Sequence, residues 1–150
     1  MIIQRINRTN PDKVFIIVRN DTTVFTKGQP IVYTFDGTND GLDVIDCKAG
    51  AGAKSMLVAG IADSAIPAGG YGLCQCYGVR DDVIVMTGSK DTDSTGSIGD
   101  HMVLHTASDC LSVVATGLIT QLKVGFVLGE TVDSAGVLAT TTATVFIRLM

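Results

Sequence analysis

Cys74 and Cys76 stand one residue apart in the segment GIADSAIPAGGYGLCQCYGV and are the side chains most suggestive of chemistry. Two thiolates at this spacing could hold Zn²⁺ if other soft ligands joined them. The remaining thiols and imidazoles of the chain are Cys47, Cys110, His101 and His105. Structural zinc sites, however, use Cys-x2-4-Cys pairs on turns, whereas this pair falls in an apolar, strand-like run. A buried free cysteine packs as a small apolar side chain, so we expect core packing and no bound metal.

Other motifs that could support catalysis are incomplete. His101 and His105 enclose the sequence HMVLH, which lacks the glutamate of the HExxH pattern. The sequence GAGAKS at residues 50–55 ends in Lys-Ser as a phosphate loop does, but Ala53 stands where that loop needs glycine. No Gly-x-Ser-x-Gly nucleophile elbow occurs. We therefore expect no catalytic residue, no cofactor and no enzymatic activity.

Several carboxylates occur in close pairs, which could in principle bind calcium. None of these pairs is completed by the bidentate glutamate that closes an EF-hand loop. We expect them to lie in solvated loops. The pairs are Asp43 with Asp46, Asp81 with Asp82, and Asp91 with Asp93.

The composition favours a β-sheet protein. The 150 residues are 46% hydrophobic but only 5% aromatic and 17% charged, so the apolar content is mostly small and branched. Abundant Val, Thr and Gly with little charge is typical of strands and turns. The net charge of −4 argues against a nucleic-acid-binding surface, which needs clustered Lys and Arg. A chain of this length most simply forms one domain with a substantial core.

No segment has the pattern of a secretory leader, because Arg5 and Arg8 interrupt the N-terminal apolar residues. No apolar run approaches the length of roughly 18 residues that crosses a bilayer. We therefore expect a protein that is made in the cytoplasm, does not contact a membrane and keeps its cysteines reduced.

Apolar residues mostly alternate with a period of two or form short unbroken runs. Gly, Asn, Asp and Ser bound these segments along the chain. We expect about ten strands, because turn signals return every 8 to about 12 residues, the spacing of a sandwich or barrel. The expected strands are 13–20, 30–37, 42–49, 55–62, 71–79, 82–88, 101–106, 111–117, 123–129 and 142–150. The predicted fold is all-β, a compact β-sandwich or barrel with little or no helix; residues 63–66 alone leave room for a short one. Residues 1–13 form an N-terminal arm or edge strand, and residues 14–150 form a single domain.

The glycines indicate a weak internal repeat. Gly28 and Gly60 in the first half correspond in their surroundings to Gly99 and Gly125 in the second, which suggests two related β-units. Each unit contains a glycine followed by a strand, an Ala-Gly turn and another strand. In the sequence IPAGGYG, the proline fixes one φ angle while the two glycines supply left-handed conformations, so we expect a hairpin there.

The same stretches carry a family resemblance. GQPIVY, VAGIADSAIPAGGYGLCQCYGV, GSIGDHMVLHT and VGFVLGETVDSAGVLATTTATVFI together look like the small capsid decoration, or head cement, proteins of tailed bacteriophages. The resemblance covers residues 24–147. The chain departs from that pattern in the long insert before Gly60 and in GETVDS, where a simpler hairpin would be expected.

The resemblance implies a virion structural protein rather than an enzyme. Proteins of that family bind the major capsid protein on the outer surface of the phage head, commonly as homotrimers, after assembly in the host cytoplasm. They clamp neighbouring subunits and stabilise the shell against the pressure of the packaged DNA. Symmetry and many copies make such weak contacts effective together.

The N-terminal sequence MIIQRINRTNPDK would then be a capsid-binding arm. Three isoleucines offer apolar contacts, and two arginines could meet an acidic capsid surface. These candidate capsid-binding residues are Ile2, Ile3, Arg5, Ile6 and Arg8. An ordinary edge strand is an equally good interpretation of this segment.

Two other functional classes stay open. A trimeric fibre or receptor-binding domain shares the Gly- and Thr-rich composition. The hairpin AIPAGGYGLCQCYGVR is also similar to that of trimeric dUTPases, a class of all-β nucleotide hydrolases. Those enzymes need an Arg-Ser-Gly phosphate grip and an Asp-x-Gly-Tyr-Arg-Gly segment, and the chain contains neither, so hydrolysis is the weaker alternative.

Overall fold

The computed structural model describes residues 13–35, 41–47, 57–87, 98–105, 108–113, 123–129 and 139–149. Every regular element within these ranges is a β-strand, which confirms the all-β prediction. The strands are β1 (Val14–Asn20), β2 (Pro30–Tyr33), β3 (Asp43–Asp46), β4 (Val58–Ala62), β5 (Tyr71–Thr87), β6 (His101–Leu104), β7 (Leu111–Val113), β8 (Gly125–Val127) and β9 (Ala139–Arg148). In this described part of the chain no helix is long and apolar enough to cross a membrane.

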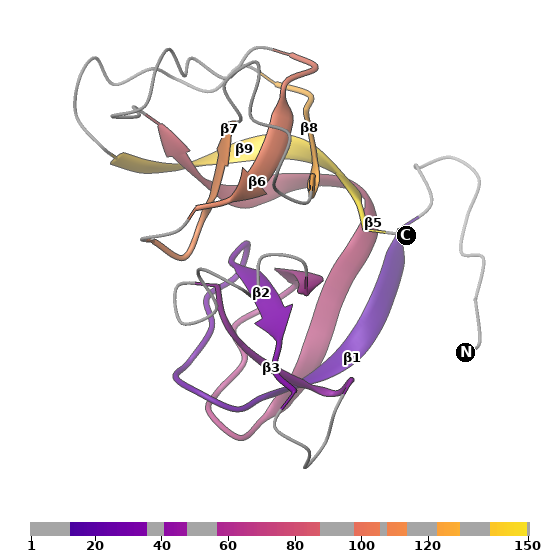
Figure 1. Ribbon diagram of the computed structural model, residues 1–150, viewed down its shortest axis with the longest axis vertical. Coiled ribbons are helices and arrows are strands. Elements are labelled where there is room, and N and C mark those ends of the chain that lie inside the picture. Colours follow the sequence, from indigo (N-terminus) through magenta and orange to yellow (C-terminus); the bar gives the residue numbers. More distant parts are fainter. Residues whose placement is uncertain are drawn as a thin grey trace.

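Five strands close into a first barrel, the lower group in Figure 1. Its strand order is β1-β3-β2-β4-β5, and β5 pairs with β1 to complete the ring. The pairing of β1 with β3 is parallel, and the other pairings are antiparallel. Closure leaves no free edge strand in the ring, which removes the usual site of edge-to-edge aggregation.

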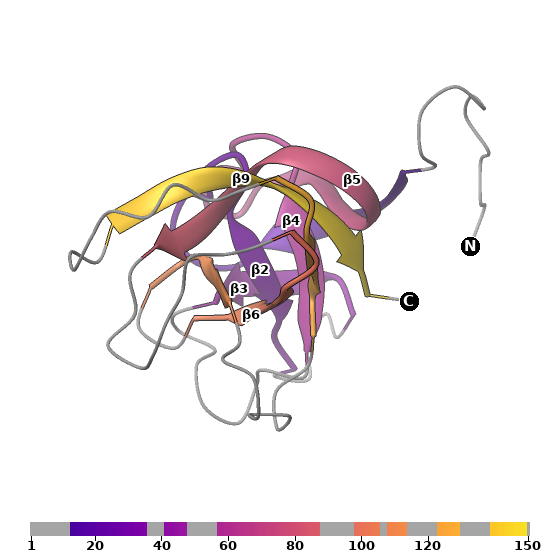
Figure 2. The same ribbon diagram turned by 90° about the horizontal axis from the view of Figure 1, so that it is seen from above.

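A second barrel repeats this arrangement with the next strands of the chain. Its order is β5-β7-β6-β8-β9, β5 pairs with β9 to close the ring, and the pairing of β5 with β7 is the parallel one. The 17-residue strand β5 belongs to both barrels, and Figures 1 and 2 show it bending from one into the other. Its pairing with β9 shifts register between Arg80 and Val83, and a bulge of this kind bends a strand.

The glycine repeat predicted from the sequence corresponds to real structural equivalence. The Gly28 amide donates to the Ala62 carbonyl at 3.0 Å, and the Gly99 amide donates to the Val127 carbonyl at 2.8 Å. Gly125, like its counterpart in the first half, lies so close to the opposite strand that an added Cβ would overlap a backbone carbonyl oxygen. Gly60 and Gly125 are therefore both required by a close approach of backbones, whereas Gly28 and Gly99 share a positive φ, of 82° and 96°.

Two hydrophobic clusters fill the molecule. The first lies inside the first barrel and comprises Val18, Phe25, Ile31, Val44, Ala59, Ala62, Ile66 and Cys74. The second fills the second barrel and also takes in the alternate side chains of β2, β3 and β4, namely Val32, Ile45, Val58 and Ile61. These three strands therefore have buried side chains on both faces, which explains the apolar sequences PIVY of β2 and VAGIA of β4. In β3, two aspartates flank the apolar pair Val44 and Ile45.

Three sequence predictions need correction. The strands expected at 71–79 and 82–88 are one strand, because the charged residues between them are accommodated by the bulge rather than by a turn. Residues 63–66 are not helical: Ile66 instead forms a bridge with Phe25. The segment 13–20 is a strand but not a buried one, since Phe15 and Ile17 are exposed on its outer face.

The connection from β4 to β5 contains the predicted glycine turn. The Gly70 amide donates to the Pro67 carbonyl at 2.9 Å, and Gly69 has a φ of 71° between them. This is the position at which a type II turn requires a left-handed residue. Only one of the two adjacent glycines takes the left-handed conformation, so the prediction holds for Gly69 and not for Gly70.

Candidate interaction surface

The four cysteines are free and buried, as expected for packing residues. Cys47 belongs to the cluster that fills the second barrel, and Cys74 belongs to the one inside the first. Burial raises the pKa of both thiols well above the ordinary range, and it raises the pKa of Cys110 to about 12. Among the described residues no group of three or more His, Cys, Asp or Glu side chains could hold a metal ion together. These thiols are poor nucleophiles at neutral pH.

An ion-pair network joins the two barrels at the bend of β5. The Arg80 guanidinium is 4% exposed and pairs with Asp63 at 3.0 Å and with Asp82. Lys27, from the β1–β2 connection, pairs with Asp82 at 2.9 Å. Burial opposes ionisation of Asp82, but hydrogen bonds from Lys27 and Arg80 outweigh it and lower the pKa of this carboxyl. The carboxylate pair predicted to be solvated thus includes a structural ion pair.

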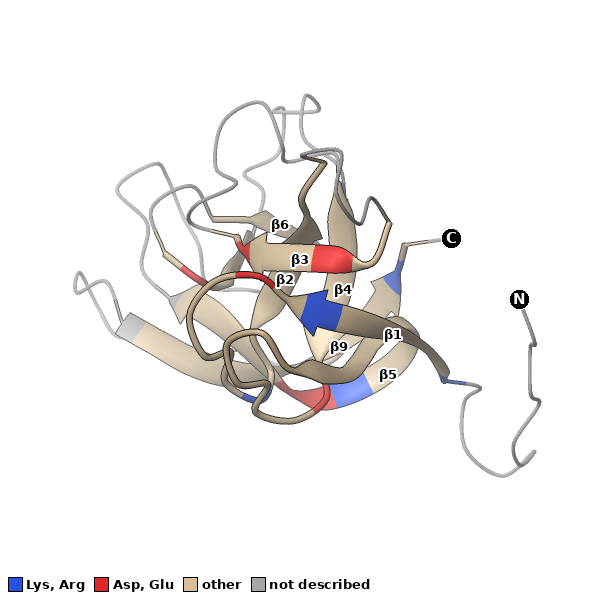
Figure 3. Cartoon of the chain, turned by 90° about the horizontal axis from the view of Figure 1, so that it is seen from below, with Lys and Arg blue, Asp and Glu red and all other residues tan. Residues whose placement is uncertain are grey.

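A second ion pair holds β1 against β3, and Figure 3 shows the basic and acidic segments side by side. The Arg19 guanidinium lies 3.2 Å from the carboxylate of Asp43, which is 2% exposed. The two residues are also register partners in the parallel pairing. This pair stabilises the barrel, and no local sequence pattern predicts it because the partners are far apart in the chain.

An exposed apolar surface lies on the first barrel, over β1 and the start of β5. It consists of Phe15, Ile17, Tyr71 and Leu73, which we call the ribbon face. Ile17 and Leu73 are register partners, so their side chains lie together on the outside of the barrel. Ile17 is 64% exposed and Tyr71 is 65% exposed. A contiguous apolar patch of this kind marks an interaction site on a soluble protein.

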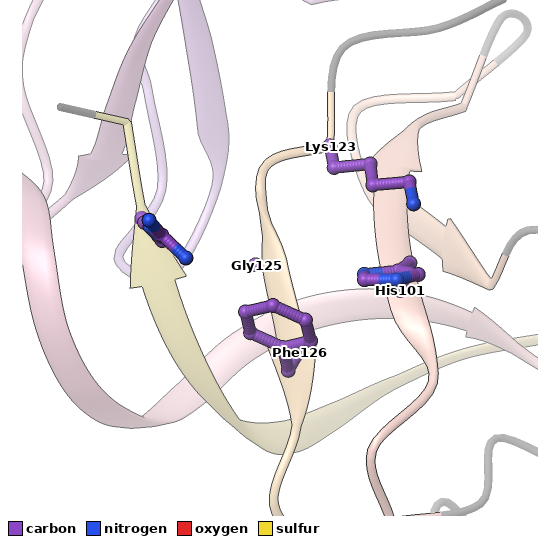
Figure 4. A pocket seen from close by; sticks show the side chains of 5 residues that line it. His101, Lys123, Gly125 and Phe126 are labelled. Carbon is purple, nitrogen blue, oxygen red and sulfur yellow. The ribbon is translucent and has the colours of Figure 1, made fainter. Parts of the chain in front are cut away.

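The second barrel carries a different surface, a pocket of about 300 Å³ shown in Figure 4. Its residues are His101 of β6, Gly125 and Phe126 of β8, Lys123 just before β8, and Arg148 of β9. His101 and Phe126 are register partners whose ring centroids are 4.8 Å apart. The pocket therefore combines an aromatic floor with two permanent cations, a combination suited to contact with another macromolecule.

The sequence alone predicts only part of this surface. The candidate capsid-binding residues Ile2, Ile3, Arg5, Ile6 and Arg8 lie outside the described residues, as does the loop GAGAKS. His101 was singled out as a metal-ligand candidate, but its structural partner is Phe126. The ribbon face was missed because an apolar strand gives the same sequence pattern whether or not another element covers it.

Comparisons with known proteins agree on the fold. No protein-family model matches the chain, and no curated protein matches it. Its structure is similar to the crystal structure of the head fiber gp8.5 N base in bacteriophage phi29, with a TM-score of 0.51 and 14% sequence identity. The similarity covers 91% of this chain and 95% of that chain, so the two molecules share an all-β fold over nearly their whole length.

Proposed function

We propose that this chain is a structural protein of a bacteriophage virion that binds the outer surface of the head. The observation that carries the proposal is the fold shared with a phage head fiber base over 91% of the chain. Fold alone does not fix a function, so the surface must supply the rest of the argument. An exposed apolar ribbon face and a cationic aromatic pocket are features of a protein that works through contacts.

Within this role we favour a capsid decoration protein that binds the major capsid protein as a homotrimer and stabilises the shell. Capsid surfaces repeat, and a symmetric oligomer that touches several subunits gains avidity without strong individual contacts. No catalysis is part of the proposal, and it needs neither nucleic acid nor a membrane. The buried thiols, with raised pKa values, are consistent with a chain whose cysteines serve packing.

The base of a head fibre is the second candidate, because the matching structure is itself the base of such a fibre. The two roles share attachment to the head and differ in what the attached protein does. A decoration protein raises the resistance of the shell to rupture, whereas a fibre base anchors a further structure and leaves shell stability unchanged.

The experiment uses phage heads assembled without this protein and the purified full chain. We expect saturable co-sedimentation with the heads and a rise in the temperature at which they release DNA. Saturable binding without that rise would favour the fibre base over decoration. The absence of binding to the heads would contradict both, and release of pyrophosphate from dUTP with magnesium would support the nucleotide hydrolase instead.

A further inference from the structure

At the junction between the two barrels, the second half of β5 covers the face of the first barrel that carries Lys27 and Gly28. The Ile84 amide of β5 donates to the Gly28 carbonyl at 2.9 Å, and a Cβ at Gly28 would overlap the Asp82 carbonyl. Beside this contact, the Lys27 ammonium pairs with the Asp82 carboxylate at 2.9 Å. Lys27 and Gly28 of the first barrel therefore dock against the part of β5 that begins the second.

In the part of the chain that the structure describes, no residue covers the equivalent face of the second barrel. Gly99 is the counterpart of Gly28 by its hydrogen bond to β8, yet a Cβ built there meets no atom within 4 Å. The residue before it, Ile98, is the counterpart of Lys27 and is 65% exposed. In the second barrel, the apolar side chain of Ile98 thus stands in the place of Lys27, and among the described residues no strand covers it as β5 covers Lys27.

The pocket belongs to this same open face. Pro30 pairs with Ile61 in the first barrel as His101 pairs with Phe126 in the second. Ile61 is fully buried because the second barrel covers it, whereas Phe126 lines the open pocket in Figure 4. The pocket therefore lies on the face of the second barrel that is equivalent to the covered junction face of the first.

The second half of β5, which covers the junction face of the first barrel, also has a counterpart. This counterpart is β1, and its outer face is exposed in the described part of the chain. β1 occupies the same place in the first barrel as the second half of β5 does in the second, with one parallel and one antiparallel neighbour of the same order. Ile61 pairs with Gln75 as Phe126 pairs with Phe146, so Gly72 of β5 corresponds to Ala143 of β9. Val18 lies opposite Gly72 and Val83 lies opposite Ala143, so Val18 and Val83 correspond. Counting back by one residue matches Ile17, which is 64% exposed, with Asp82, at the bulge where β5 has one residue more than β1.

We propose that a second copy of this chain docks head to tail on the first, with Ile98 of one copy against Ile17 of the next. The contact brings the equivalent barrel faces together and replaces the lysine–aspartate pair by two isoleucines. The hydrogen bond from the Ile84 amide is not repeated, because its counterpart, the Arg19 amide, donates to the Leu42 carbonyl at 2.9 Å. It places the ribbon face of one copy over the open face and pocket of its neighbour. The inference names the contact of the homo-oligomer in the proposed function, and it rests on that oligomer but not on capsid binding.

The area of the ribbon face and the symmetry of the contact are consistent with a second copy of the chain as the partner. The four partly exposed side chains of the ribbon face present on the order of 300 Å² of apolar surface. A stable interface buries about 800 Å² on each partner, so this patch forms its apolar centre and the polar rim supplies the rest. The two surfaces differ, so the contact is heterologous and copies continue until a ring closes.

The decisive experiment exchanges the isoleucines for the ion pair of the internal junction. Ile98→Lys and Ile17→Asp are made singly and together in the full chain, and mass is measured by sedimentation velocity over a range of concentrations. Each single variant buries an unpaired charge in the contact and is expected to sediment as one chain. The double variant restores the lysine–aspartate pair and is expected to associate again, but at a higher concentration than the wild type, because the pair replaces buried apolar area. Val24→Asp is the matched control, since Val24 is 59% exposed and belongs to neither face.

Circular dichroism and thermal melting establish that each variant is folded. A wild-type chain that sediments as one chain at every concentration would overturn the inference, as would single variants that keep the wild-type mass. A double variant that stays a single chain would overturn the pairing of these two positions. Monomeric wild type that still binds phage heads would refute the inference while leaving head attachment intact.

A second pair of variants avoids buried charge altogether. Ile17→Cys and Ile98→Cys chains are mixed and oxidised; the native thiols are buried and react poorly. We expect a covalent dimer from the mixture and only traces from either variant alone. Equal yields of dimer in all three samples would contradict a head-to-tail contact.

Discussion

Replacing Gly125 by alanine tests the claim that each barrel needs a close approach of two backbones. A Cβ at this position would overlap the Phe146 carbonyl oxygen and come within 3.1 Å of the Val145 side chain. The obstacle is backbone on the neighbouring strand, so no side-chain rotation relieves it and β8 must move away from β9. Overpacking of this kind costs about 1–3 kcal/mol, and the loss of one strand hydrogen bond adds about 1 kcal/mol.

The gain from a less flexible unfolded chain offsets about 0.4–1 kcal/mol of that cost. We therefore expect Gly125→Ala to lower the free energy of unfolding by about 2–3 kcal/mol, measured by urea denaturation. For a chain of this size the melting temperature falls by roughly 2–4 °C for each kcal/mol, so a fall of about 8 °C is expected.

Gly129→Ala is the matched control for this substitution. Gly129 follows the same strand, and a Cβ there would make ordinary contacts with Thr144, the nearest atom being 3.6 Å away. Its stability is expected to stay within about 1 kcal/mol of wild type, because no backbone has to move. Equal stability of the two variants would refute the reasoning, since both lose the same glycine flexibility and only one meets the opposite strand.

Three further predictions concern charge, thiols and the N-terminal segment. The pKa of Asp82 is lowered in the folded state, so its stabilising effect is present above the unfolded pKa and is lost as the pH falls through the folded value. Unfolding free energy is therefore expected to drop on acidification below about pH 4, and less steeply in Asp82→Asn; identical pH profiles would contradict this. Combining Cys74→Ala with Cys76→Ala should cost about 1–3 kcal/mol and leave the metal content unchanged, and loss of stoichiometric zinc on elemental analysis would show that the pair is a ligand set. Arg5→Ala with Arg8→Ala should weaken co-sedimentation with phage heads without changing the melting temperature, and unchanged binding would remove the N-terminal segment from the contact.

The sequence was most informative where local chemistry determines structure. Strands could be placed because apolar runs end at turn residues, and the repeat could be found because Gly60 and Gly125 are each pressed against a neighbouring backbone. The strand break expected near residue 80 was wrong because Arg80 and Asp82 look like turn residues in sequence. In the fold Arg80 and Asp82 pair with each other across a bulge. Their further partners, Asp63 and Lys27, lie far away in the sequence, so no local pattern predicts this network.

The interaction surface was harder to predict for a related reason. The run VFIIV is apolar at every position, which normally indicates a strand covered on both sides. β2 and β4 have that character because the second barrel covers them. β1 has it although no described residue covers its outer face, so Phe15 and Ile17 are exposed. Only the arrangement of the two barrels distinguishes these cases.

The proposed contact between chains differs in chemistry from the junction within the chain, because the partners meet in different ways. Within the chain, β5 connects the barrels covalently, so the effective concentration of one barrel at the other is high and little binding energy is needed. An ion pair such as Lys27 with Asp82 suffices there and fixes the register of the contact. Between separate chains, association must overcome the loss of translational and rotational freedom, and this requires buried apolar area. Isoleucines at positions 17 and 98 supply such area, where a partly exposed ion pair contributes little. The same barrel contact can thus be ionic inside one chain and apolar between two, and this difference in chemistry is what the exchange of charges at positions 17 and 98 measures.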